Sequence, residues 1–220
     1  MQPDFWLERW TRDQIGFHQH DINAMLRAHW SALAVPDSAK VFVPLCGKSR
    51  DMLWLRARGH EIIGVEFIRK AVNDFFADNE LTPKVSVHPP FERWEAEGVT
   101  LLCGDFFDLT AADLRDVSAV YDRASLIALP TEMRARYVEH MRMILPPGIE
   151  TLLITLSYPA NEMKGPPFAV SEAEVRALYD EGFAVEHLAG RDVLAESAQL
   201  RARGLTALTE QAYRLRRLGA

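Results

Sequence analysis

Cysteine is scarce in this 220-residue sequence, which contains only Cys46 and Cys103. Two cysteines form neither a disulfide framework nor a metal-ligand cluster, so we expect a reducing compartment and a cytoplasmic location. Long apolar runs are absent as well, and no segment of the sequence is long enough to cross a bilayer. The first ten residues carry Asp4, Glu8 and Arg9, which fits neither a signal peptide nor a spanning helix.

Basic residues are outnumbered by acidic ones, with 25 Lys and Arg against 31 Asp and Glu. The formal net charge is therefore −6, and no summed basic field is available to hold a polyanion. Nucleic acids and anionic membranes are consequently poor partners for this chain. Hydrophobic residues make up 48% of the sequence, which predicts one globular domain with a substantial core over residues 1–220.

Glycine is missing from the position that decides how "FVPLCGKS", residues 42–49, is interpreted. The end of this stretch resembles a phosphate-binding loop, but that loop requires a glycine where Phe42 stands, for the turn that exposes backbone N–H groups. A dinucleotide needs three glycines in such a turn, and this one contains only Gly47. Phosphates and pyrophosphates are therefore disfavoured. What remains is a nucleoside cofactor without phosphate, of which S-adenosylmethionine is the common one.

Short apolar segments alternate with helical patterns along most of the chain. Strands are predicted at residues 40–46, 61–66, 99–106, 117–126, 150–158, 183–193 and 208–218, and helices at 22–33, 49–59, 68–76, 131–145 and 171–182. The last two strands follow one another without a helix between them, which indicates a hairpin. We therefore predict a doubly wound α/β fold, in which a mostly parallel sheet is covered by helices on both faces and ends in an antiparallel hairpin.

Two regions lie outside this repeat. Residues 1–36 are expected to form an N-terminal lid and helix, followed by the doubly wound core at 40–220. Residues 82–98, "TPKVSVHPPFERWEAEG", are long for a connection inside an α/β unit. They are either an insertion that covers a site or a surface excursion.

In an open α/β sheet, ligands bind beyond the carboxyl ends of the strands. Leu45 and Gly47 follow the first predicted strand, Glu66 ends the second, and "GDFFD" and "YDR" end the third and fourth. An acidic residue at the end of the second strand, about twenty residues after the glycine turn, is placed to accept hydrogen bonds from ribose hydroxyls. Glu66 is thus a candidate ribose ligand, the alternative being a solvated carboxylate at a strand end.

Several motifs distributed over nearly the whole chain carry a family resemblance: "WLERW", "IGFHQ", "FVPLCGKSRDMLWL", "GHEIIGVE", "YDRASLIAL", "LSYP" and "GPPF". In order and spacing they resemble the thiopurine S-methyltransferases, specifically the bacterial members. The resemblance implies a monomeric cytoplasmic enzyme of the Rossmann-like class I methyltransferase fold, with a seven-stranded sheet and no metal. It also implies methyl transfer from S-adenosyl-L-methionine, leaving S-adenosyl-L-homocysteine, to the sulfur of aromatic and heterocyclic thiols such as thiopurines. Bacterial relatives are further associated with selenium and tellurium compounds.

The resemblance assigns roles to individual residues. The expected S-adenosylmethionine contacts are Trp10, Leu45, Glu66 and Arg123, with Asp105 and Phe106 bordering the adenine, and the expected substrate contacts are Phe17 and Arg123. For two of these residues, a purely structural role is the alternative to ligand binding. Trp10 lies one helical turn after Trp6, so the pair is alternatively a hydrophobic stripe that anchors the N-terminal segment. Arg123 is alternatively a structural partner of Asp122 or of another carboxylate.

No catalytic nucleophile is expected, because methyl transfer is an in-line displacement that needs no covalent enzyme intermediate. His18 is the obvious candidate for a general base, but a lone histidine is more often a packing or capping residue. Cys46 ends a buried strand, where burial raises a thiol pKa, so we expect it to pack rather than react. One position departs from the bacterial pattern, since Gln199 stands where relatives often carry an arginine.

Other functions stay open at this point. A halide or simple-thiol methyltransferase shares the fold but typically lacks the long opening with "WLERW" and "GFHQ". A module that binds S-adenosylmethionine without turnover is a further alternative, whereas the single-glycine turn opposes a nicotinamide-dependent oxidoreductase. The motifs do not determine the methyl acceptor, because its pocket is built from loops and aromatic residues whose relative positions the sequence does not contain.

Overall fold

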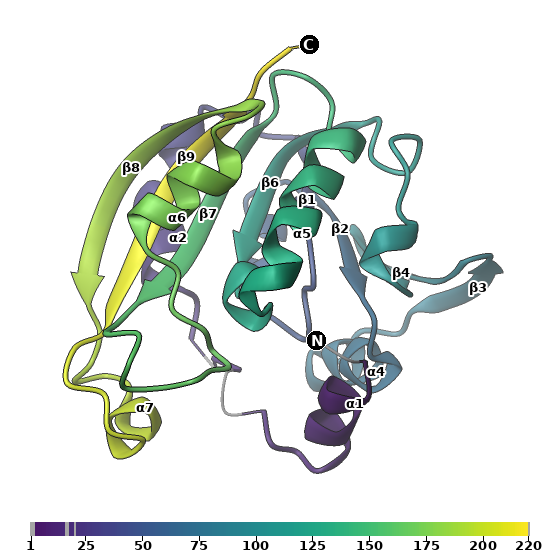
Figure 1. Ribbon diagram of the computed structural model, residues 1–220. Coiled ribbons are helices and arrows are strands. Elements are labelled where there is room, and N and C mark those ends of the chain that lie inside the picture. Colours follow the sequence, from purple (N-terminus) through teal and green to yellow (C-terminus); the bar gives the residue numbers. More distant parts are fainter. Residues whose placement is uncertain (1–2, 16–17, 20, 220) are drawn as a thin grey trace.

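A single sheet organises the computed structural model, which describes residues 3–15, 18–19 and 21–219. Within these residues the sheet has nine strands in the order β3-β4-β5-β2-β1-β6-β7-β9-β8, and helices cover both of its faces (Figure 1). The strands are β1 Lys40–Val43, β2 Glu61–Glu66, β3 Lys84–His88, β4 Phe91–Ala96, β5 Val99–Cys103, β6 Val117–Arg123, β7 Glu150–Ser157, β8 Phe183–Asp192 and β9 Thr209–Arg217. The helices are α1 Pro3–Thr11, α2 Ala24–His29, α3 Asp51–Arg56, α4 Arg69–Asp78, α5 Thr131–Ile144, α6 Glu172–Tyr179 and α7 Ala198–Ala202, with 3-10 turns η1 Trp30–Leu33, η2 Phe106–Asp108 and η3 Leu126–Ala128.

The centre of the sheet is parallel. Strand β1 pairs in parallel with β2 and β6, β2 pairs with β5, and β6 pairs with β7. At the far end, β9 runs antiparallel between β7 and β8. This arrangement confirms the predicted Rossmann-like α/β fold with its C-terminal hairpin. Because the strand order reverses between β1 and β6, the crevice for a ligand is expected at the carboxyl ends of these two strands.

The described sheet has two strands more than the family resemblance implied. Residues 82–98 form the β3–β4 hairpin, and β4 pairs antiparallel with β5. Phe91 and Trp94 of β4 are buried, whereas Val87 of β3 is 72% exposed. The segment is therefore a β-hairpin that lengthens the sheet at its edge, because β4 has buried apolar side chains to pack and β3 pairs with it outside (Figure 1).

Two apolar clusters lie on opposite faces of the sheet. On one face, α5 packs through Tyr137 on a cluster that contains Val120 of β6. On the other face, Leu26 of α2 and Phe75 of α4 belong to a cluster that contains Tyr121 of β6. Successive side chains of a strand point to opposite faces, so β6 contributes to both clusters in alternation. The same alternation decides where its polar side chains go.

The N-terminal region consists of two pieces. Helix α1 packs against α4 through Trp10, Ile68 and Ala71, at the end of the molecule where the parallel strands finish (Figure 1). The helix predicted at 22–33 is confirmed as α2 followed by η1, and both pack on the sheet. Among the described residues, no helix combines the length and the apolar character that crossing a membrane requires.

Candidate active site

The turn between β1 and α3 brings backbone N–H groups to the carboxyl end of the sheet. Leu45 and Gly47 both have a positive φ, of 44° and 51°. Glycine adopts this conformation readily because it has no Cβ, whereas Leu45 is strained there. Cys46 donates its N–H to the carbonyl oxygen of Val65 at 3.0 Å, and Gly47 donates to Glu66 Oε2 at 2.8 Å. The turn is thereby held against the end of β2.

Glu66 is buried at the end of β2, with 8% of its surface exposed. Its two carboxylate oxygens accept the backbone N–H groups of Gly47 and Ile68, both at 2.8 Å. Burial raises the pKa of Glu66, while the hydrogen bonds from Ile68 and Gly47 act in the opposite direction. A solvated carboxylate was the alternative, and it is wrong. Glu66 is a desolvated acceptor fixed beside the glycine turn.

Trp10 covers the same turn. Its Cζ2 atom is 3.5 Å from the place that a Cβ would take at Gly47, and only 3% of Trp10 is exposed. The ring packs with Ile68, which caps the start of α4, and with Ala71 of α4, and partly buried Trp6 lies against this cluster. The hydrophobic stripe is therefore confirmed. It also places Trp10 at the turn where the cofactor contact was predicted.

The side chains of Asp105 and Phe106 differ in exposure, although the two residues are neighbours after β5. Asp105 is exposed, and its Oδ1 accepts the N–H of Phe107 at 2.9 Å, which caps η2. The ring of Phe106 is 3% exposed, stacks on Tyr137 with 4.8 Å between ring centroids and meets His140 edge-on. Since this ring belongs to the core beneath α5, Phe106 can border an adenine only through its backbone.

Arg123 pairs with Asp51 at the start of α3. Its Nε donates to Asp51 Oδ2 at 2.8 Å, and its Nη2 donates to Ser49 Oγ at 3.1 Å. The exposed fractions of the two side chains are 13% for Arg123 and 1% for Asp51. Pairing with a carboxylate is thus confirmed, but Asp122 as the partner is wrong. Asp122 points to the opposite face of β6, where it accepts the hydroxyl of Tyr137 at 2.8 Å.

Further donors converge on Asp51, and no motif of the sequence predicted them. Tyr121 donates its hydroxyl to Oδ2 at 2.8 Å, and Asn23 donates its backbone N–H to Oδ1 at 2.9 Å. The Asn23 side chain caps α2, and its Nδ2 donates to buried Glu210 of β9 at 2.8 Å. One signal was available in the sequence. Tyr121 and Arg123 are two residues apart on a predicted strand, and such residues share a face.

The loop "GPPF", residues 165–168, is fastened beyond the end of β7. Tyr158 donates its hydroxyl to the carbonyl oxygen of Pro167 at 2.6 Å, and Arg203 Nη1 donates to that of Pro166 at 3.0 Å. Gln199 lies on α7 with its side chain exposed. Helices α7 and α1 both lie at the end of the molecule where the parallel strands finish, so this loop region belongs to the same end as the glycine turn (Figure 1).

The remaining candidates have separate outcomes. Phe17, the predicted substrate contact, lies outside the described residues. His18 is partly buried and donates its backbone N–H to Ile15 at 2.8 Å, and its role as a base stays a prediction.

Cys46 is 5% exposed, which confirms that it packs, and burial together with nearby Glu66 raises its pKa well above the usual value. In the described part of the chain no three His, Cys, Asp or Glu residues are grouped to hold a metal ion. The expectation of a metal-free enzyme stays a prediction.

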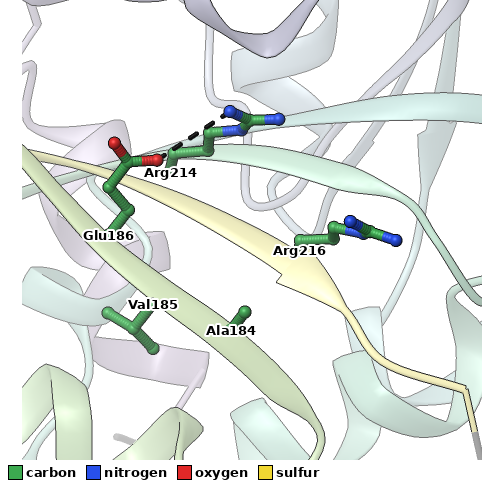
Figure 2. A pocket seen from close by; sticks show the side chains of 5 residues that line it. All are labelled: Ala184, Val185, Glu186, Arg214 and Arg216. Atoms are coloured by element: carbon green, nitrogen blue, oxygen red, sulfur yellow. Dashed lines mark ion pairs between the residues drawn. The ribbon is translucent and has the colours of Figure 1, made fainter.

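Two surface hollows lie apart from these residues. One is on β8 and β9 and is lined by Ala184, Val185, Glu186, Arg214 and Arg216 (Figure 2). Across it, Arg214 lies 3.8 Å from Glu186 and also donates to Glu150 at 2.8 Å. The other hollow, near Trp30 and His60, is at the amino ends of β1 and β2. Neither hollow contains a predicted site residue.

Nearly the whole chain matches one family model, described as thiopurine S-methyltransferase, over residues 1–218. A thiopurine S-methyltransferase of Nitrosospira multiformis is 50% identical over 215 residues, which cover 98% of this chain and 98% of that protein. One of Pseudomonas fluorescens is 50% identical over 216 residues, covering 98% and 99%. A solved structure of a Burkholderia thailandensis 1,6-didemethyltoxoflavin-N1-methyltransferase, with bound S-adenosylhomocysteine, matches with a TM-score of 0.61 and 14% identity over 98% of this chain and 87% of that one.

Proposed function

Because the chain belongs to the thiopurine S-methyltransferase family and is an S-adenosylmethionine-dependent methyltransferase, we propose that it methylates the sulfur of aromatic or heterocyclic thiols such as thiopurines. Relatives that are half identical over nearly their whole length are thiopurine S-methyltransferases, which supports this acceptor class. We further propose a monomer that acts in the cytoplasm on small molecules, without a metal. Selenium and tellurium compounds are part of the same proposal, since they are soft, polarisable acceptors like sulfur.

The burial of the Glu66 carboxylate is the main observation that supports the proposed cofactor site. It lies at the carboxyl end of β2, which pairs with β1 beside the point where the strand order reverses, and both of its oxygens are fixed by backbone N–H groups. A carboxylate that is already desolvated and oriented loses little freedom when a ribose diol donates to its remaining lone pairs. Trp10, Leu45, Asp105 and the backbone of Phe106 lie around the same strand ends, which supports their role as the other cofactor contacts.

The same turn is unsuited to a phosphate. The N–H of Gly47, which a phosphate would require, already donates to Glu66. The Glu66 carboxylate would also repel a second anion at this place. Phe42, which stands where a phosphate loop has its first glycine, is fully buried in β1. These contacts favour an uncharged ribose over the pyrophosphate of a nicotinamide dinucleotide.

The chemistry divides between the cofactor and the chain. When bound, S-adenosylmethionine supplies an electrophilic methyl group on a sulfonium. The chain contributes orientation, because most of the acceleration of an in-line displacement comes from holding the reacting atoms collinear and close. Trp10 excludes water from the glycine turn. An aromatic or heterocyclic ring delocalises the charge of a thiolate and makes its thiol more acidic than an ordinary thiol with a pKa of about 8.5, which reduces the need for a strong general base.

Arg123 contributes oriented hydrogen-bond donors to the site more than it contributes net charge. Its guanidinium carries a positive charge that Asp51 compensates at 2.8 Å, so the pair as a whole is neutral. A guanidinium presents five N–H donors in a rigid plane, and the bonds to Asp51 and Ser49 fix that plane. We assign Arg123 to the cofactor or to the ring acceptors and thiolate of the substrate through charge-assisted hydrogen bonds.

One set of titrations and rates tests the proposal. The protein is titrated with S-adenosylmethionine, S-adenosylhomocysteine and NAD, and methyl transfer is then followed to mercaptopurine, to a simple alkyl thiol and to iodide. We expect binding of the first two ligands, none of NAD, and the highest kcat/KM with mercaptopurine. A preference for iodide or the alkyl thiol would assign the chain to a different acceptor class, and binding without any transfer would make it a binding module.

Glu66→Ala tests the ribose contact. We expect S-adenosylhomocysteine affinity to fall by about 1.5 to 3 kcal/mol, the scale of a lost hydrogen bond to a charged group. The matched control is Glu61→Ala, at the other end of β2, where the carboxylate is exposed and only pairs with Lys40 at 3.7 Å. Calorimetric affinities that are equal in the wild type and in Glu66→Ala would refute the ribose role.

Gln199→Arg tests whether this chain lacks an acceptor contact that relatives use. The side chain at this position is exposed on α7 and carries no charge. Transfer to mercaptopurine is measured for Gln199→Arg, Arg123→Lys and the double variant. We expect Arg123→Lys to lower turnover and Gln199→Arg to raise it. If Arg123→Lys keeps the wild-type rate, Arg123 does not position the acceptor.

A further inference from the structure

The carboxylate of Asp51 connects Arg123 to the parts of the chain around it. Asp51 is 1% exposed and accepts from Arg123 Nε, from the hydroxyl of Tyr121 and from the backbone N–H of Asn23, at 2.8, 2.8 and 2.9 Å. Its own N–H points to Ser49 Oγ at 3.3 Å, and the same hydroxyl oxygen accepts Arg123 Nη2. Asp51 therefore joins the glycine turn, strand β6 and the start of α2.

Tyr121 and Arg123 share one oxygen of that carboxylate. Both donate to Asp51 Oδ2 from the same face of β6, two residues apart. The hydroxyl of Tyr121 is buried with the rest of its side chain, and burial together with the charge of Asp51 raises its pKa well above the usual value. Tyr121 consequently stays a neutral donor over the working pH range. Its bond to Oδ2 limits rotation of the carboxylate, and so limits where the guanidinium can lie.

The other oxygen of Asp51 is held from the N-terminal side. Asn23 donates its backbone N–H to Oδ1, caps α2 with its side-chain oxygen and donates Nδ2 to Glu210 Oε1 at 2.8 Å. Glu210 is 6% exposed and lies 3.9 Å from Arg191. The carboxylate thus has a fixed donor on each oxygen besides Arg123. A buried carboxylate needs donors for the lone pairs that its ion pair leaves unsatisfied, and the donors that meet this need also hold it in one orientation.

We propose that Tyr121 is a positioning residue, which holds the Asp51 carboxylate so that Arg123 is oriented for its ligand before the ligand binds. The inference rests on the proposed function, because it assumes that Arg123 faces the cofactor or the acceptor. It predicts that removal of one buried hydroxyl, which touches no ligand, lowers ligand affinity through the guanidinium. A preorganised arginine spends no further side-chain entropy on binding.

The chain offers a matched control on the opposite face of β6. Tyr137 donates its hydroxyl to buried Asp122 at 2.8 Å, the same bond length as that from Tyr121 to Asp51. Both tyrosines are at most 1% exposed. The phenylalanine variants Tyr121→Phe and Tyr137→Phe therefore each delete one buried hydroxyl from one buried aspartate and keep the ring. Only the first deletion is connected to Arg123.

The test compares the two variants at a temperature where circular dichroism shows both to be folded. We expect both to lower Tm, and only Tyr121→Phe to weaken S-adenosylhomocysteine binding or raise the KM for mercaptopurine, by about tenfold. Each variant is also combined with Arg123→Lys. If Tyr121 acts through Arg123, its effect should shrink to less than twofold in that background, whereas an independent effect would multiply.

Two results would overturn the inference. One is an equal effect of Tyr121→Phe and Tyr137→Phe on both ligands, and the other is a Tyr121→Phe effect that multiplies fully with Arg123→Lys. Failure of the proposed function looks different. If the wild type binds S-adenosylhomocysteine but methylates no thiol, the acceptor proposal fails, while the cofactor affinities of the same variants still decide the role of Tyr121.

Discussion

Two buried aspartates on opposite faces of β6 accept the same hydrogen bond in different surroundings. Asp51 accepts the hydroxyl of Tyr121 and Asp122 accepts that of Tyr137, each at 2.8 Å. Asp51 also pairs with the guanidinium of Arg123, whereas Asp122 has no ion-pair partner among the described residues. The first carboxylate lies at the candidate active site, and the second lies in the core beneath α5.

The difference appears in the pKa of Asp122. Burial raises that pKa from its ordinary value of 3.8 to about 6, and the hydrogen bond from Tyr137 offsets only part of the shift. A hydrogen bond from a tyrosine is therefore not enough to keep a buried carboxylate fully charged. The two aspartates differ in geometry by one cation, since only Asp51 is paired with a guanidinium, and that guanidinium belongs to the candidate site.

The largest expected effect comes from breaking the ion pair. Asp51→Asn leaves Arg123 buried without its counter-charge, and loss of one partner of a buried pair costs about 3 kcal/mol of unfolding free energy. Urea denaturation at neutral pH measures this loss. S-adenosylhomocysteine binding by the folded fraction should weaken as well. A loss below about 1 kcal/mol would mean that solvent already screens the pair.

A smaller, pH-dependent effect is expected on the other face of β6. The folded-state pKa of Asp122 is raised, so its contribution to stability is complete below pH 3.8 and is lost as the pH rises through about 6. Asp122→Asn removes this titration. Relative to the wild type, its unfolding free energy should therefore rise by about 2 kcal/mol between pH 4 and pH 7.

Paired denaturation curves at several pH values check this second prediction. A difference between Asp122→Asn and the wild type that is independent of pH would show that Asp122 titrates normally in the folded protein. Cofactor affinity serves as the internal control. It should stay unchanged, because Asp122 faces away from Arg123 and the glycine turn.

The smallest effect is expected for a charge outside both environments. Arg216 is exposed in the hollow on β8 and β9, where its side chain lies apart from the ion pair of Arg214 and Glu186 (Figure 2). Arg216→Ala should change the unfolding free energy by less than about 0.5 kcal/mol, the usual range for surface substitutions. S-adenosylhomocysteine affinity should equal that of the wild type. A measurable loss of affinity would show that this hollow communicates with the site.

The position of a residue at a strand end was predictable from the sequence where it depended only on nearby residues. Glu66 ends an apolar run about twenty residues after a glycine turn, and the structure places its carboxylate against Gly47 N–H. Phe106 followed no such pattern, since only the family resemblance placed it near the adenine. Its ring packs on Tyr137 because a large apolar side chain is more stable in the core.

The partner of Arg123 required long-range geometry. Asp122 is adjacent in sequence, yet strand alternation sends it to the opposite face, and Asp51 is 72 positions away. Asn23 and Glu210, which complete the network, are 187 positions apart. No periodicity or motif encodes such pairs, since they form only when β1, β6 and β9 assemble in one sheet.

The sequence by itself determined the fold class, the family and the strand ends at which we propose that the cofactor binds. Hydrophobic periodicity and turn residues act over a few positions, so they can be read along one chain. Tertiary structure alone decided that Asp51 holds Arg123, that Trp10 covers Gly47 and that residues 82–98 lengthen the sheet. These outcomes depend on which buried groups come close enough to pack or to form hydrogen bonds with one another. A buried polar group without a hydrogen-bond partner costs folding free energy.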